Sequence, residues 1–191
     1  MAVMPRTPRS RRFSPRGSTK AAIVVRRAPG DGRRGILQAG PLRLRCALGR
    51  GGTSAFKREG DGATPVATMR LLHAYQPAQG IAGLRLALPT SRPRHDLGWC
   101  DAPTHPAYNR PVRLPFAASH ETIRRPDPLY DLVVVLDWNI RSRRRGCGSA
   151  IFFHVAKPGY APTEGCVALA ARDIRRLAPF LRPGASLAVC R

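Results

Sequence analysis

Acidic residues, lysine and aromatic side chains are scarce in this sequence. Its 191 residues include 11 Asp and Glu against 33 Lys and Arg, which gives a formal net charge of +22, and only 3 of the basic residues are Lys. Because the Arg residues are spread along the whole chain, we attribute their number to a GC-rich coding bias and not to selection for phosphate contact. A basic composition promotes solubility and nonspecific attraction to polyanions. It defines no nucleic-acid partner, and we expect no specific one.

Long apolar runs are absent as well. No segment approaches the roughly 20 apolar residues that cross a membrane, so no membrane span is expected. The longest early run, residues 21–25, is too short for the apolar region of a secretory signal. Arg11-Arg12-Phe13 resembles a twin-arginine signal, but no apolar stretch follows it. The sequence therefore shows no export signal.

The five cysteines form no CxxC pair and no regular framework, which argues against a disulfide-dense scaffold. Cys46 and Cys190 lie in apolar runs and are expected to be buried small hydrophobic residues. Cys100, Cys147 and Cys166 lie in polar or glycine-rich surroundings. These three are the cysteines that could carry chemistry.

The composition changes once along the chain. Residues 1–18 are mostly Arg, Ser, Pro and Gly, which cannot bury enough surface to order themselves, so a basic disordered arm is predicted there. The remainder, residues 20–191, has the length of one domain. With 43% apolar residues in the whole chain, this domain can bury a real core.

Strands are expected to outnumber helices. The apolar positions from Leu169 to Leu181 have helical spacing, with Asp173 in the early turns where the helix dipole favours a carboxylate. Residues 76–129 show little periodicity and are expected to form a long lid or binding loop. The predicted fold class is mainly β, with one C-terminal helix and long irregular loops. The expected strands are residues 21–26, 37–48, 69–72, 132–136, 150–155 and 186–190.

One histidine and one cysteine could form a nucleophilic pair. His154 ends a buried strand, and Cys166 follows a turn-rich loop and precedes the predicted helix. A thiol needs a base or a positive neighbour to act as a nucleophile near neutral pH. Gly165 removes side-chain bulk beside the sulfur, so that a substrate carbonyl could approach backbone N–H groups in an oxyanion site.

Two plainer interpretations remain open from the residues alone. His154 could be a hydrogen-bonded histidine at a strand end, and Cys166 a small residue at a helix N-terminus. A zinc site made by Cys147, His154 and Cys166 is conceivable, but the spacings match no common pattern and a fourth ligand is not evident. We therefore expect no metal.

Several motifs occur in order along the chain. They are Lys57-Arg-Glu-Gly-Asp-Gly-Ala-Thr64-Pro65, Gly98-Trp99-Cys100-Asp101, Tyr108-Asn109-Arg110-Pro111-Val112, residues 130–137, and Phe153-His154 followed by Thr163-Glu164-Gly165-Cys166-Val167-Ala168-Leu169. Together they resemble the catalytic domain of the L,D-transpeptidase (YkuD) family, in which a strand His is paired with a downstream [Ser/Thr]-x-Gly-Cys. The resemblance spans roughly residues 20–191 and implies a mixed β-sandwich.

The resemblance also implies a reaction. Cys166 would be the nucleophile, His154 the general base and proton donor, and Gly165 with the Cys166 N–H part of the oxyanion site. The thiolate would attack the diamino-acid carbonyl of a peptidoglycan stem tetrapeptide and release D-alanine, and an amine or water would resolve the thioester. No cofactor is implied, and a monomer in the periplasm or cell envelope is expected, although the visible sequence leaves the cytoplasm open.

The chain departs from the family pattern at a few positions. Glu164 stands where many members carry His or Lys, and its carboxylate would stabilise the thiol over the thiolate unless it faces away. Ala67 replaces a glycine, the His-to-Cys interval is short, and residues 141–145 form a basic run that is either a solvated loop or an attraction for anionic wall polymers.

The long irregular region contains candidate substrate contacts. Trp99 and Tyr108 could line the substrate groove, with Arg110 pairing a stem carboxylate. The alternative is that the two aromatic residues only attach the loop to the core. Two further functions are weighed against the transpeptidase: a carboxypeptidase-type hydrolase, and a basic binding protein for polyanions on a degenerate catalytic fold.

Overall fold

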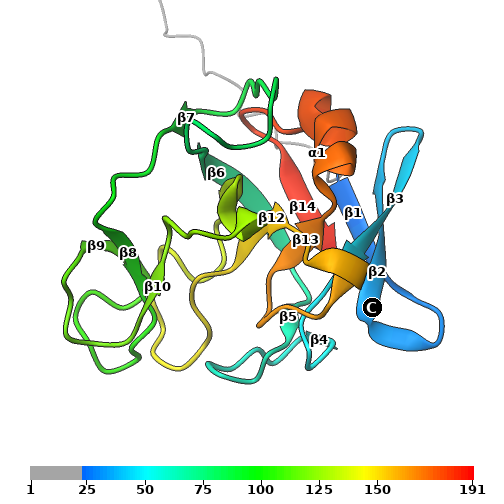
Figure 1. Cartoon of the computed structure of the whole chain (residues 1–191). Helices are drawn as coiled ribbons and strands as arrows, with labels where there is room; N and C mark the ends of the chain where they lie inside the picture. Colours follow the sequence, from blue (N-terminus) through cyan, green and yellow to red (C-terminus); the bar gives the residue numbers. More distant parts are fainter. Residues whose placement is uncertain (1–22) are drawn as a thin grey trace, which may run out of the picture.

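The computed structural model describes residues 23–191, and the predicted arm of residues 1–18 lies outside them. Figure 1 shows how the elements are arranged. The helical elements are α1 (Ala171–Leu177) and the 3-10 turns η1 (Pro128–Tyr130), η2 (Pro158–Tyr160) and η3 (Ala178–Phe180). The strands are β1 (Ile23–Ala28), β2 (Asp31–Ala39), β3 (Leu42–Ala47), β4 (Thr53–Ser54), β5 (Thr64–Pro65), β6 (Thr68–Tyr75), β7 (Thr90–Ser91), β8 (Leu97–Cys100), β9 (Arg110–Arg113), β10 (His120–Thr122), β11 (Val133–Leu136), β12 (Phe152–Val155), β13 (Val167–Leu169) and β14 (Ser186–Val189).

Nine strands form one large mixed sheet. Their order is β11-β12-β13-β3-β2-β1-β14-β6-β7, and β11 also pairs with β6. Because β11 pairs with β6, the eight strands from β11 to β6 in this order form a closed ring around a common core. The pairs β1–β14, β12–β13 and β6–β7 are parallel, and the other pairs in this sheet are antiparallel. The mainly β fold class with one helix near the C-terminus is confirmed.

The strand predicted over residues 37–48 is instead part of a hairpin. Strands β2 and β3 pair from Arg34–Ala47 to Ala39–Leu42, and the chain reverses at Gly40 and Pro41. Gly40 has a φ of +53°, a left-handed conformation that glycine adopts without steric cost. The alternation within β3 is as expected, because Leu44 and Cys46 are buried while Arg43 and Arg45 are exposed.

Strands β11 and β12 carry core residues on both faces. Phe153 and Val155 of β12 belong to the main core, whereas Phe152 packs in a second cluster on the other face. Val133 and Val135 of β11 also lie in the second cluster. The strands expected at 132–136 and 150–155 are thus present and buried on both faces, so each face of this part of the sheet is covered.

Helix α1 covers the main-core face. Its residues Ile174 and Leu177 are buried with Val167 and Leu169 of β13. Asp173 lies in the first turn, as expected, and pairs with Arg176 at 3.2 Å. In the described part of the chain, no helix is long and apolar enough to cross a membrane.

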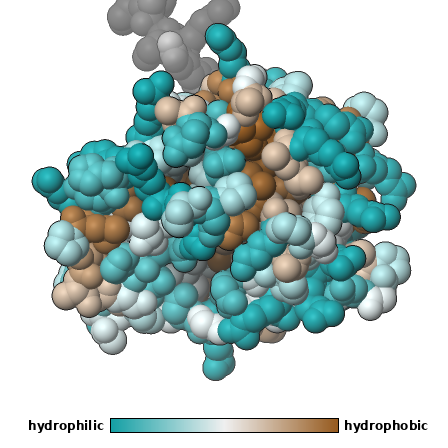
Figure 2. Space-filling model, viewed as in Figure 1, coloured by the Kyte–Doolittle hydropathy of each residue, from teal (hydrophilic) through white to brown (hydrophobic). Residues whose placement is uncertain are grey.

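A three-stranded sheet covers the other face. Residues 76–129 are less irregular than expected, because β8, β9 and β10 pair in the order β10-β8-β9. Trp99 of β8 packs edge-to-face on Phe152 with ring centroids 5.3 Å apart. Figure 1 shows this sheet on the left, apart from the large sheet, and Figure 2 shows hydrophobic side chains at the surface there. The small sheet thus forms one wall over the second cluster.

Trp99 is expected to anchor this wall. Its side chain is 5% exposed, and its Nε1 donates to Asn109 Oδ1 at 3.0 Å. Trp99→Ala should lower the free energy of unfolding by about 3–5 kcal/mol, because it removes a large buried ring and leaves a cavity. Phe56→Ala is the control, since Phe56 is 84% exposed and its loss should change stability by less than about 0.5 kcal/mol. Urea unfolding of both variants tests this, and equal losses would contradict it.

Candidate active site

The parallel pairing of β12 and β13 brings the two candidate residues together. His154 lies opposite Ala168 in the register, and Phe153 lies opposite Val167. Cys166 directly precedes β13 and lies beside Phe152, whose N–H donates to Cys166 Sγ at 3.3 Å. Because side chains alternate along a strand, Phe152 and His154 leave the same face of β12. Cys166 leaves the sheet on that face too, and it packs in the second cluster with Phe152.

The thiol of Cys166 is enclosed by backbone groups. Sγ donates to the Ala150 carbonyl at 3.4 Å and accepts the Phe152 N–H. Ala150 has a φ of +50°, a left-handed conformation that is uncommon outside glycine. Burial raises the pKa of the Cys166 thiol to about 12. The sulfur is therefore a protonated, hydrogen-bonded thiol at neutral pH.

His154 is oriented by its own strand. Its Nδ1 lies 2.8 Å from the Val155 carbonyl oxygen, which can only accept, so Nδ1 carries the proton and Nε2 is the basic nitrogen. The ring also meets Tyr130 edge-to-face at 5.4 Å. Burial lowers the pKa of His154 to about 4, although the bond to Val155 opposes this shift. At neutral pH the imidazole is thus an uncharged base.

The expected helix N-terminus at Cys166 is wrong. The residues after Cys166 form strand β13, and α1 begins only at Ala171. This helix packs with Val167 and Leu169 on the opposite face of the sheet from Cys166. The helix dipole therefore gives the thiolate no direct support.

Gly165 is required by the backbone. Its φ is +133°, and a Cβ there would lie 2.9 Å from the Ala63 carbonyl oxygen and 3.3 Å from Ile151 Cδ1. Its N–H donates to Thr163 Oγ1 at 3.2 Å, and that hydroxyl donates to the Cys166 carbonyl at 2.7 Å. The Gly165 N–H is therefore engaged inside the loop, whereas the glycine itself permits the close approach of the chain at residue 63.

Cys166 and His154 line a common pocket of about 220 Å³. Its charged wall comes from several segments that are distant in sequence. Ser149 donates to Glu59 Oε2 at 2.8 Å, and Tyr108 donates to the same oxygen. Asp101 Oδ1 is buried and has no hydrogen-bond partner among residues 23–191. The charged side chains that line the pocket are Glu59, Asp101, Glu121, Arg125, Lys157 and Glu164.

Glu164 faces mainly solvent. Its side chain is 76% exposed, and its Oε2 pairs with Arg50 Nε at 2.7 Å. Burial is the largest cause of the raised pKa of Cys166. Of the two carboxylates that raise this pKa further, Glu121 acts more strongly than Glu164. The carboxylate next to the Gly-Cys pair is therefore a minor influence on the sulfur.

The three predicted substrate contacts lie outside the lining of this pocket. Trp99 and Tyr108 are 5% and 2% exposed and pack behind the wall, and Arg110 is exposed on β9. Asn109, which lies between Tyr108 and Arg110 in the sequence, is 1% exposed. Its Oδ1 accepts the Trp99 Nε1–H and the Ala150 N–H. It thus connects the small sheet to the residue whose carbonyl holds the thiol.

Cys147 lies in a different place from the candidate pair. It lines a separate pocket with Phe56 and Trp138, and its carbonyl accepts the Trp138 Nε1–H at 2.9 Å. Within residues 23–191, no three His, Cys, Asp or Glu side chains are grouped closely enough to hold a metal ion. The zinc alternative of Cys147, His154 and Cys166 is therefore not assembled in this structure.

Sequence reasoning missed most of the pocket. Glu59 and Asp101 lie within the motifs quoted above but carry no sequence signal for a role in the pocket, and Glu121 and Arg125 lie outside those motifs. Arg125 holds Glu121 at 3.1 Å and Asp127 at 2.8 Å. Their clustering depends on long-range folding, so the available signal was only their place in or near those motifs.

Comparison with known proteins identifies the family. The model of the YkuD family, the L,D-transpeptidase catalytic domain, matches residues 31–189, well over half of the chain. The protein therefore belongs to this family. The chain is similar to the solved structure of an L,D-transpeptidase from Mycobacterium smegmatis, with 14% identity and a TM-score of 0.38, over 90% of this chain and 59% of that one. It thus spans about three-fifths of that protein's length. None of the curated proteins compared with it matches.

The two carboxylates near Cys166 should differ in effect. Glu121→Gln and Glu164→Gln each remove a negative charge, so both should lower the pKa of Cys166 and speed its alkylation at a fixed pH below that pKa. Both carboxylates are paired with an arginine, but Glu121→Gln should have the larger effect, because the Glu121 side chain is 32% exposed and that of Glu164 is 76% exposed. Iodoacetamide labelling of Cys166, followed by peptide mass mapping over a pH series, checks the order. A larger effect of Glu164→Gln would mean that its carboxylate turns towards the sulfur.

His154 should make stability depend on pH in acid. Its pKa falls from 6.5 to about 4 on folding, so between these values the unfolded chain binds more protons than the folded one. The contribution of His154 to the free energy of unfolding is therefore complete above pH 6.5, and it is lost as the pH drops towards 4. His154→Asn should flatten this part of the profile in urea unfolding measured from pH 7.5 to 4. Parallel profiles for the two proteins would refute the assignment.

Proposed function

We propose that this protein is a cysteine acyltransferase that acts on peptidoglycan stem peptides, with Cys166 as nucleophile and His154 as general base. The observation that carries the proposal is that both side chains leave the same face of two paired strands and line one pocket. Membership of the L,D-transpeptidase family supports the same class of reaction. A shared pocket is what a thiol and its base need for direct proton transfer.

Acylation begins with a stem-peptide carbonyl at Sγ. The thiol leaves the Ala150 carbonyl and passes its proton to Nε2 of His154 while sulfur forms a bond to the carbonyl carbon. The backbone N–H of Cys166 stabilises the oxyanion, and Gly165 leaves room for the approach. The imidazolium then protonates the departing amine of D-alanine as the C–N bond breaks. A thioester and a neutral His154 remain.

Proton transfer is coupled to attack in this proposal. The pKa of the buried thiol is raised to about 12 and that of the buried imidazole is lowered to about 4, so a preformed thiolate–imidazolium pair is disfavoured. The ion pair has to form as the substrate carbonyl takes up the developing negative charge. The proposal therefore predicts little thiolate until an acyl donor is bound.

The charges in the pocket favour a substrate with a cationic group. Asp101 Oδ1 is a buried acceptor without a partner in the described chain, and Glu59 is held at the same pocket by two hydroxyl groups. A buried carboxylate oxygen without a partner is costly unless a ligand donates to it. The diamino-acid residue of a stem peptide carries an ammonium group that meets this need. We accordingly propose an amine as acyl acceptor, and water would make the enzyme a carboxypeptidase.

The remaining expectations belong to the same proposal. The protein would act in the cell envelope, as expected for its family, and as a monomer. It would need no cofactor and no nucleic acid. The arm of residues 1–18 would be dispensable for the reaction on small peptides, which a truncated chain would test directly.

Covalent labelling tests the nucleophile. Incubation with a carbapenem should add one acyl group to the intact protein, because an activated thiol opens the β-lactam ring. Cys166→Ala should abolish this adduct and keep the fold, and His154→Ala should slow its formation by roughly 10²-fold or more, with recovery at high pH as the thiol ionises without a base. Intact mass spectrometry measures both.

Two other cysteines serve as controls. Cys100→Ala and Cys147→Ala should form the adduct at the rate of the unmodified protein, because neither lines the pocket of Cys166 and His154. An adduct that survives Cys166→Ala would overturn the site assignment. A folded protein that forms no adduct at all would favour the degenerate binding protein instead.

A further inference from the structure

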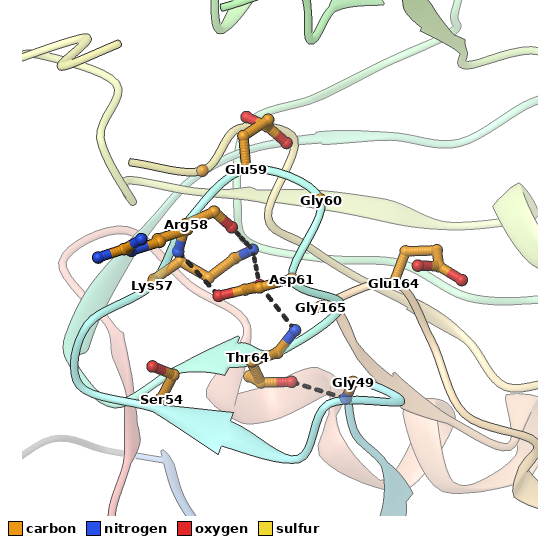
Figure 3. Close-up of polar contacts among 12 residues, drawn as sticks. Gly49, Ser54, Lys57, Arg58, Glu59, Gly60, Asp61, Thr64, Glu164 and Gly165 are labelled. Carbon is orange, nitrogen blue, oxygen red and sulfur yellow. Dashed lines mark hydrogen bonds and ion pairs between the residues drawn. The ribbon is translucent and has the colours of Figure 1, made fainter. Parts of the chain in front are cut away.

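A buried lysine closes the loop before β5 into a rigid turn. The Lys57 side chain is 2% exposed, and its Nζ lies 2.5 Å from Asp61 Oδ1 and 2.6 Å from the Arg58 carbonyl oxygen (Figure 3). Asp61 also accepts the N–H groups of Arg58 at 2.8 Å and Ala63 at 2.9 Å. Both oxygens of one carboxylate thus fix residues 57–63, and Lys57 is the charge that balances them.

This turn supports the loop that carries Cys166. The Ala63 carbonyl fills the space where a Gly165 side chain would lie, at 2.9 Å from an added Cβ. The next residue, Thr64, accepts the Gly49 N–H at 2.9 Å and donates to the Cys166 carbonyl at 3.4 Å. The position of Cys166 therefore depends on Ala63 and Thr64, which follow closely after Asp61 in the sequence.

The stem of Lys57 supports the opposite side of the site. A Cβ on Gly148 would lie 2.9 Å from Lys57 Cγ, so the segment after Cys147 runs directly against the lysine stem. Two residues further on, the Ala150 carbonyl accepts the thiol proton. Lys57 thus packs directly against the chain on one side of the sulfur and, through Asp61, holds the turn on the other side.

Lys57 also contributes charge at the sulfur. After burial, which raises the pKa of Cys166, Glu121 and Glu164 raise it further while Lys57 lowers it. The titratable and charged groups that line the pocket or act on the sulfur from the packed elements are Lys57, Glu59, Asp101, Glu121, Arg125, Tyr130, His154, Lys157 and Glu164.

We propose that Lys57 is a positioning residue for Cys166, in which the Lys57–Asp61 ion pair fixes the turn under the nucleophile and the Lys57 ammonium stabilises the negative charge that develops on sulfur. The inference rests on the proposed role of Cys166 as nucleophile. It adds a function for Lys57 and Asp61, neither of which lines the pocket itself. Lys57 needs no contact with substrate for this role.

Two variants that break the same ion pair separate charge from structure. Lys57→Met removes the positive charge and keeps the stem, so alkylation of Cys166 by iodoacetamide at pH 8 should slow by about threefold or more. Asp61→Asn leaves the lysine charge unbalanced, so alkylation should accelerate by about threefold. A purely structural role would change both rates in the same direction. Peptide mass mapping of Cys166 over a pH series gives the two profiles.

The remaining variants keep the test decisive. Arg43→Met removes one exposed positive charge from β3 and should leave the profile unchanged. Lys57→Met with Asp61→Leu replaces the buried pair by apolar side chains, which proteins often tolerate, and because it removes both charges it should alkylate at a rate between those of the two single variants. If Lys57→Met fails to fold, this double variant and Asp61→Asn carry the test. Equal directions, or no change, would overturn the inference.

The same variants give a readout in the proposed reaction. Lys57→Met should slow carbapenem acylation by about threefold or more, in step with alkylation. If the unmodified protein forms no carbapenem adduct, the proposed function fails. The alkylation profiles still test the effect of Lys57 on the reactivity of Cys166. If the adduct forms but the profiles do not separate, the function stands and the role of Lys57 is wrong.

Discussion

The parallel pairing of β12 with β13 is the constraint on which the site depends. It places Cys166 beside Phe152, two positions along β12 from His154, so that the two side chains share a face although 11 residues separate them in sequence. The face would be open to water without the small sheet, which buries Phe152 under Trp99. Pairing and cover together bury a thiol and an imidazole that line the same pocket.

Burial then determines the protonation states of the two groups. Low polarity disfavours charge on both groups, which is why the pKa of Cys166 is raised and that of His154 is lowered. An uncharged pair is inert towards water-borne oxidants and acylating agents of low reactivity, because the thiolate is the reactive form. In the proposed mechanism His154 takes the thiol proton during attack, and the buried Lys57–Asp61 pair is proposed to assist by its charge and its hold on the turn.

The sequence was sufficient for the elements with strong local signals and insufficient for the rest. The apolar runs at 132–136 and 150–155 predicted β11 and β12, because strands buried on both faces need no alternation. The strands of the small sheet are three or four residues long, so their periodicity is too short to detect. The residues alone left the pairing of His154 with Cys166 as one interpretation among several, and the family resemblance made it the expected one. The Lys57 contact with Gly148 joins residues 91 positions apart, which no local pattern encodes.

The central claim is that Cys166 carries a stem-peptide acyl group. Incubation with a stem tetrapeptide and no added acceptor, followed by acid quench and peptide mass mapping, measures this directly. The account predicts a mass gain equal to the tripeptide acyl group on the peptide that contains Cys166, matched by release of free D-alanine, and neither signal in Cys166→Ala. Acylation at another residue, or D-alanine release that persists in Cys166→Ala, would contradict it.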